Sequence, residues 1–232
     1  MSSRAQTACA VTGVIGVVLI LIGFVTAHYV PPPKANWTAE HLQSFYQSHS
    51  DLKRFGLFVM LFGTAFFAPL VAGMKVVLDR IEGPPGTLAT LQAIIGAAGT
   101  VLLILFVMLL GVAAFRPDRS PDVTQAFHDA GWFMAFLSAV PFTMQAITIA
   151  AAVLGHPETL LPRWFGYLNI SVAVLLIPGA ALLLFKTGPL SYHGILGYWI
   201  PLVVFASWMI AMAWAIRRSA NTPDPIGAAP AA

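Results

Sequence analysis

The chain of 232 residues carries too few charged side chains for a water-soluble protein of its size. Hydrophobic residues make up 58% of it and charged residues only 9%, whereas about a quarter of a soluble domain is charged. The mean hydropathy of +0.81 agrees, so the composition indicates an integral membrane protein. The formal net charge of +3 includes no basic run, which excludes nucleic acid as an expected partner.

Six apolar stretches are each long enough to cross a bilayer as a helix, which needs about 20 residues. Their approximate bounds are 10–30, 55–78, 88–115, 131–154, 167–185 and 194–216. Because the stretches are continuously apolar rather than alternating, they favour helices over the strands of a membrane barrel. We predict an all-α integral membrane protein with a single six-helix bundle over residues 1–220. The Pro/Ala-rich tail, 221–232, is expected to be disordered.

The loop after the first span carries a further helical signal. Leu42, Phe45 and Tyr46 recur at helical spacing, and Thr38 precedes them as a cap. This pattern predicts a short amphipathic surface helix within residues 37–49 whose apolar side contacts lipid or the mouth of the bundle.

Prolines and small residues bear on how the spans pack. Four spans contain a proline, which bends its helix and leaves either a cavity in the bundle or no more than a bend: Pro69, Pro141, Pro178 and Pro201. The first span also carries a stripe of small residues: Ala10, Gly13, Gly16, Gly23 and Ala27. Such a stripe allows close backbone approach, either within the chain or to a partner subunit.

The orientation of the bundle depends on the Lys and Arg residues in its loops. An even number of spans places both termini on one side, and the 12 Lys and Arg residues then divide equally between the two sides. The raw count therefore decides nothing. Because Arg217 and Arg218 directly follow the last span, we expect both termini to be cytoplasmic.

The polar residues inside the spans are amides and hydroxyls, of which Gln92, Gln145 and Asn169 stand out. An amide in hydrocarbon needs a hydrogen-bond partner. These residues are therefore expected to hold neighbouring spans together, with the polar lining of a ligand cavity as the alternative. Within the predicted bounds no span has a central His, Asp or Glu, which argues against a haem-binding bundle or a proton-coupled carrier.

Topology places five of the six histidines on the face that holds the first, third and fifth loops. His28, His128 and His193 each lie near the end of a span, and Asp129 follows His128 directly. Imidazole and carboxylate suit a transition metal, so these four residues are the candidate metal site, with Asp129 as ligand or as a partner that orients an imidazole. The alternative is that the histidines are solvated at the membrane interface.

Two segments of the C-terminal half carry a resemblance: Trp164-Phe165-Gly166-Tyr167 and Phe185-Lys186-Thr187-Gly188-Pro189, with His128-Asp129-Ala130-Gly131-Trp132 before them. Over roughly the last 110 residues the chain resembles a group of multi-pass inner-membrane proteins of bacteria, actinobacteria especially. The resemblance implies a helical bundle in the bacterial cytoplasmic membrane. It implies no activity and no catalytic residue.

The leading functional expectation is a non-catalytic membrane protein, either an accessory or structural subunit or a protein that binds a lipophilic molecule. Its expected partners are membrane lipid and other membrane subunits or a second copy of itself. One alternative is a membrane-embedded metal-dependent enzyme, or a subunit of one, that acts on an apolar substrate. The other is a channel or facilitator, although neither a ring of charges nor a polar pore stripe is visible in the spans.

Overall fold

The computed structural model describes residues 2–156 and 160–222, and within them the chain is helical and contains no strand. The elements are α1 (Ser3–Thr26), α2 (Ala39–Gln47), α3 (Ser50–Ala65), α4 (Phe67–Glu82), α5 (Thr87–Phe115), α6 (Pro121–Leu137), α7 (Ala139–Gly155), α8 (Arg163–Ala180), the 3-10 turn η1 (Ala181–Leu183), the π turn η2 (Ile195–Trp199) and α9 (Ile200–Asn221). Six segments are long and apolar enough to cross a membrane: Ser3–Thr26, Ser50–Glu82, Thr87–Phe115, Pro121–Gly155, Arg163–Leu183 and Ile195–Asn221. The predicted six-span bundle is confirmed. The expected tail lies outside the described residues from 223 onward.

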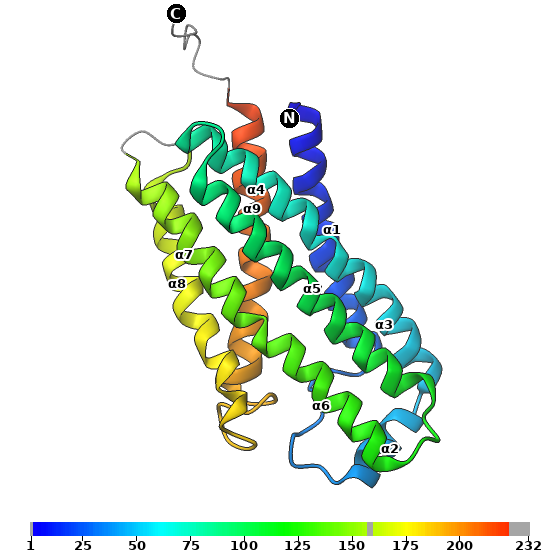
Figure 1. Ribbon diagram of the computed structural model, residues 1–232. Coiled ribbons are helices and arrows are strands. Elements are labelled where there is room, and N and C mark those ends of the chain that lie inside the picture. The colour runs from blue at the N-terminus through cyan, green and yellow to red at the C-terminus, as the bar shows by residue number, and fades with distance from the viewer. Residues whose placement is uncertain (1, 157–159, 223–232) are drawn as a thin grey trace, which may run out of the picture.

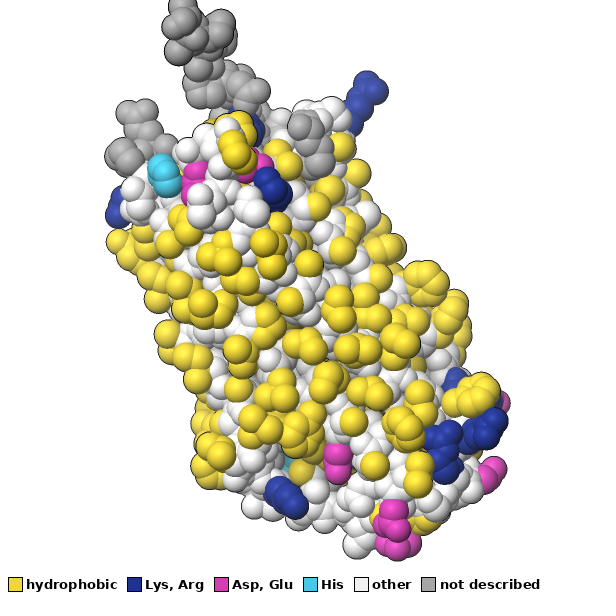
Figure 2. Space-filling model, viewed as in Figure 1, with side chains coloured by type: hydrophobic (Ala, Val, Ile, Leu, Met, Phe, Trp, Pro, Cys, Tyr) yellow, Lys and Arg dark blue, Asp and Glu magenta, His cyan; other side chains and the backbone are white. Residues whose placement is uncertain are grey.

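The spans run alternately up and down, so the loops gather at two ends (Figure 1). The described termini and the α4–α5 turn, residues 83–86, share one end, here called the terminal end. The odd-loop end holds α2 and the loops at 27–49, 116–120 and 184–194. Figure 2 shows a wide hydrophobic band between charged side chains at the two ends, which is the surface that a bilayer requires.

Two spans are each divided into two helices by a break near the middle. α3 gives way to α4 at Phe66, and α6 to α7 at Ser138. Each break lies three residues before a proline, Pro69 or Pro141. A proline ring clashes with the preceding helical turn and lacks its own N–H donor, so a bend forms at this position.

The fourth span begins earlier than predicted, which corrects the placement of His128. Helix α6 starts at Pro121 rather than at 131, so His128 lies on a helix and not in the third loop. Its side chain is completely buried. Asp122 and Asp129 interrupt the apolar run in the sequence, but Asp122 is exposed and Asp129 half-buried near the odd-loop end, where a helix tolerates them. The first two spans also begin earlier than expected, at Ser3 and Ser50.

Glycines allow α1 and α3 to touch through their backbones. A Cβ atom on Gly56 would lie 2.6 Å from the Ala27 nitrogen and 2.8 Å from the Gly23 oxygen. One on Gly63 would lie 3.0 Å from the Gly16 oxygen. The small residues of the first span therefore pack within the chain, as one of the two readings of this stripe expected.

Helix α2 packs on α6 at the odd-loop end, which confirms the predicted amphipathic helix (Figure 1). Leu42 and Tyr46 are buried, and Phe45 is half-buried. The Thr38 hydroxyl accepts a hydrogen bond from the His41 N–H at 3.3 Å and so caps the helix. The apolar side of α2 therefore contacts the bundle mouth.

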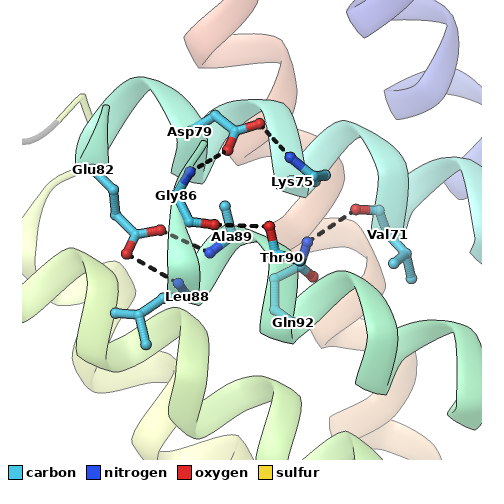
Figure 3. A network of polar contacts seen from close by, with 9 residues as sticks. All are labelled: Val71, Lys75, Asp79, Glu82, Gly86, Leu88, Ala89, Thr90 and Gln92. Atoms are coloured by element: carbon cyan, nitrogen blue, oxygen red, sulfur yellow. Dashed lines mark hydrogen bonds and ion pairs between the residues drawn. The ribbon is translucent and has the colours of Figure 1, made fainter. Parts of the chain in front are cut away.

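At the terminal end, carboxylates fix the turn between α4 and α5 (Figure 3). Asp79 accepts a hydrogen bond from the Gly86 N–H at 3.1 Å and pairs with Lys75 at 2.6 Å. Glu82 accepts from the first amides of α5, Leu88 at 3.1 Å and Ala89 at 2.7 Å. Acidic groups at a helix N-terminus satisfy its free N–H groups, so this turn is held by the chain itself.

Candidate functional site

A pocket with about 740 Å³ of empty space, including its open mouth, lies between the spans. We call it the central pocket. All six spans contribute to its wall, with residues that include Phe24 of α1, Met60 of α3, Phe106 of α5, Phe136 of α6, Leu176 of α8 and Phe205 of α9. A pocket lined by every span is the feature of this bundle best suited to hold a small molecule.

The wall of the central pocket includes residues at or beside three of the prolines in the spans. Ser138 and Ala139, at the break between α6 and α7, line it. So do Gly179, directly after Pro178 of α8, and Pro201, in the first turn of α9. Three of the four prolines therefore lie in or beside the pocket wall, as the cavity alternative expected.

The polar atoms in the wall of the central pocket are mostly engaged with the chain's own carbonyl groups. The Thr64 hydroxyl donates to the Leu61 oxygen at 2.9 Å, and the Tyr198 hydroxyl donates to the Tyr29 oxygen at 2.7 Å. Ser138 donates to the Ala135 oxygen. The wall therefore presents apolar and aromatic surface, and the described residues that form it include no Lys, Arg, Asp or Glu.

Trp132 of α6 is the exception and the centre of an aromatic cluster. Its ring stacks on Tyr192 at 5.6 Å between centroids and packs against Phe106 at 5.3 Å and Phe136 at 5.6 Å. The side chain is buried, and its indole N–H has no hydrogen-bond partner among the residues that the structure describes.

A hydrogen-bonded chain of three buried residues lies beside this cluster. The Tyr29 hydroxyl donates to the Tyr46 oxygen at 3.1 Å, and the Tyr46 oxygen lies 2.8 Å from Nδ1 of His128. Which of these two atoms donates depends on the tautomer of His128, whose second ring nitrogen is Nε2. Within the described residues this second nitrogen has no partner. Burial raises the pKa of both Tyr29 and Tyr46 above the ordinary value, so both phenols stay protonated.

The four predicted metal ligands do not form a common cluster. His28 is exposed and stacks on His49 with 5.2 Å between ring centroids, whereas His128 is held by Tyr46. His193 has Nδ1 3.1 Å from the Ser191 hydroxyl, and Asp129 accepts from the Tyr192 hydroxyl at 3.5 Å. Over residues 2–156 and 160–222, no three His, Cys, Asp or Glu side chains lie close enough together to hold a metal ion.

Tyr192 and His193, in the loop before η2, have pKa values that differ from the ordinary ones. Burial first, and then the carboxylate of Asp129, raise the pKa of Tyr192. Burial first, and then the positive charge of Lys34, lower the pKa of His193. A neutral His193 is therefore favoured at the odd-loop end.

The three intramembrane amides join spans to one another. The Gln92 amide of α5 donates to the Val71 oxygen of α4 at 3.1 Å (Figure 3), and Gln145 of α7 donates to Gln92 Oε1 at 3.0 Å. Asn169 of α8 accepts from the Trp208 indole N–H of α9 at 2.9 Å. None of the three amides lines the central pocket, so their observed contacts are hydrogen bonds that hold neighbouring helices together.

Sequence reasoning missed Tyr29, Tyr46 and Trp132 as site residues. One signal was present: His128 and Trp132 are four residues apart, so on a helix they share a face. This signal could be used only if the helix was known to begin before His128, as α6 does.

Comparisons of the chain with protein-family models, with curated protein sequences and with solved structures found no match.

Proposed function

We propose that this membrane protein binds a lipophilic small molecule in the central pocket. The observation that carries the proposal is the pocket itself, whose wall comes from all six spans and is almost wholly apolar. An apolar ligand gains from this wall because transfer out of water is favourable in proportion to the apolar area covered.

The proposed setting is the bacterial inner membrane, with both termini in the cytoplasm. The setting draws on the resemblance of the C-terminal half to bacterial inner-membrane proteins, and the orientation on Arg217 and Arg218 after the last span. Membrane lipid is the proposed immediate partner, since the spans expose many large apolar side chains.

The test fills the central pocket and asks whether a ligand still stabilises the protein. A Cβ on Gly179 would lie 3.5 Å from the Ala139 Cβ, an ordinary contact, so Gly179→Leu extends into the pocket. Gly111→Leu is the matched control, because a Cβ there meets nothing within 4 Å and the residue lies outside the pocket wall. The probe is the hydrocarbon 2-ethylnaphthalene, added to delipidated protein in detergent.

A ligand that binds only the folded state increases the free energy of unfolding, by about 2.7 kcal/mol when its concentration is a hundred times its dissociation constant. The melting temperature rises as a result. We expect 2-ethylnaphthalene to stabilise the wild type and Gly111→Leu but not Gly179→Leu. Equal stabilisation of all three proteins would show that the compound acts elsewhere and would contradict the proposal.

A further inference from the structure

Trp132, in the wall of the central pocket, carries a hydrogen-bond donor that the described part of the protein does not use. The side chain lines the pocket and is 1% exposed, yet its Nε1–H has no partner within residues 2–156 and 160–222. Buried Trp N–H groups are usually hydrogen-bonded, because an unpaired donor away from water costs free energy. Trp208 follows that rule, since its N–H donates to Asn169 Oδ1 at 2.9 Å.

A second polar atom without a partner lies one helical turn away on α6. Nε2 of His128 has no hydrogen-bond partner among the described residues. The His128 ring stands edge-on to Trp132, with 6.1 Å between centroids. The indole N–H of Trp132 can only donate, so the group that complements it is an acceptor.

The wall of the pocket also restricts the charge of the ligand. Among the described residues that line it there is no Lys, Arg, Asp or Glu, and an ion placed in apolar surroundings without a counter-charge is strongly disfavoured. An anionic lipid headgroup or a free fatty acid would lack a partner there.

We infer that the ligand is a neutral lipophile with a hydrogen-bond-accepting oxygen, such as a ketone or ester carbonyl, which accepts from the indole N–H of Trp132. The inference rests on the proposed function and adds the chemical class of the ligand. The apolar body of the ligand lies against the part of the pocket wall that Phe136, Phe142 and Leu176 form. The oxygen lies toward α6.

The experiment compares two compounds of nearly the same shape, 2-acetylnaphthalene and 2-ethylnaphthalene, of which only the first has a carbonyl oxygen. One hydrogen bond contributes on the order of fivefold in affinity. We expect the wild type to bind the ketone about fivefold more tightly than the hydrocarbon. Trp132→Phe keeps an aromatic ring but removes the N–H, so it should lose this preference and still bind the hydrocarbon. Trp208→Phe, a buried Trp outside the pocket wall, should keep the preference.

A second measurement follows the indole N–H resonances by NMR while the ligand binds to the wild-type protein. The chain has six Trp residues, so ¹⁵N labelling of the indoles gives up to six N–H resonances, and the one absent from Trp132→Phe belongs to Trp132. We expect the ketone to move this resonance downfield and the hydrocarbon to leave its proton shift closer to that of the free protein.

The outcomes separate the two proposals. If neither compound binds, the proposed function fails, and this inference fails with it. If both bind equally well, and the ketone leaves the Trp132 resonance where the hydrocarbon leaves it, the central pocket binds lipophiles but the oxygen contact is wrong.

Discussion

A 2.8 Å hydrogen bond between the Tyr46 hydroxyl and Nδ1 of His128 joins α2 to α6 across 82 residues of sequence. Both side chains are completely buried. His128 in turn packs edge-on against Trp132, which lines the central pocket. The surface helix is therefore tied to the wall of the pocket through two aromatic residues of one helix face.

The link between α2 and α6 should weaken when Tyr46 loses its hydroxyl. Tyr46→Phe leaves Nδ1 of His128 and the Tyr29 hydroxyl without a partner, and we expect α2 to open more easily by about 1–3 kcal/mol. Hydrogen exchange of the α2 amides measures this opening. Tyr29→Phe is the matched control, because it removes one hydrogen bond and leaves the Tyr46–His128 contact in place. A larger effect from Tyr29→Phe than from Tyr46→Phe would show that the contact with His128 does not hold the helix.

The two glutamines should be energetically coupled. Gln92→Leu and Gln145→Leu each leave a buried amide without its partner, whereas the double replacement removes both amides together. We expect the double variant to be less destabilised than the sum of the single ones, with a coupling of about 0.6–2 kcal/mol. Unfolding in mixed micelles measures it. Gln92→Leu combined with Asn169→Leu is the control pair and should be additive, since no hydrogen bond joins those two residues. Additive effects in the glutamine pair would show that no hydrogen bond couples Gln92 to Gln145.

His193 should titrate below the ordinary value of a histidine, and Lys34 should contribute to the shift. Burial is the larger cause and the Lys34 charge the second, and both disfavour the charged imidazolium. Lys34→Ser should therefore raise the pKa of His193 without restoring it fully. NMR titration of the imidazole measures this change. Lys186→Ser is the control, because its charge acts on Asp129 instead. No change in the pKa of His193 on Lys34→Ser would mean that the two groups do not interact.

The orientation of the bundle can be tested with single cysteines in a Cys9→Ser background. Ser44 lies on α2 at the odd-loop end, and Thr87 begins α5 at the terminal end; both are exposed. With both termini cytoplasmic, an impermeant thiol reagent added outside intact cells should label Ser44→Cys and not Thr87→Cys. The reverse pattern would invert the proposed orientation and leave the bundle unchanged.

The spans and the surface helix could be predicted because each is a local property of the sequence. A long apolar run or a helical repeat such as that of Leu42 and Tyr46 determines an element with little help from distant residues. The start of α6 was missed because the carboxyl groups of Asp122 and Asp129 resemble the end of an apolar run. Near the odd-loop end those groups reach the interface, so the helix extends through them.

The candidate site could not be predicted in the same way, because it depends on contacts between distant segments. Tyr29, Tyr46 and His128 come from a loop and two helices, and the sequence does not show that they meet. The prolines predicted bends, but only the packing of the spans decides whether bends leave a cavity. The roles of Gln92, Gln145 and Asn169 were easier to anticipate, since a buried amide must find a partner somewhere.

If the central pocket holds a lipophilic molecule, the purified protein should retain that molecule from its own membrane. Wild-type protein, Gly179→Leu and Gly111→Leu are purified under the same mild conditions, and the neutral lipophiles extracted from each are quantified by mass spectrometry. We predict that one compound is retained near one molecule per chain by the wild type and Gly111→Leu and is lost from Gly179→Leu. The same neutral compounds in the same amounts from all three proteins would contradict the account.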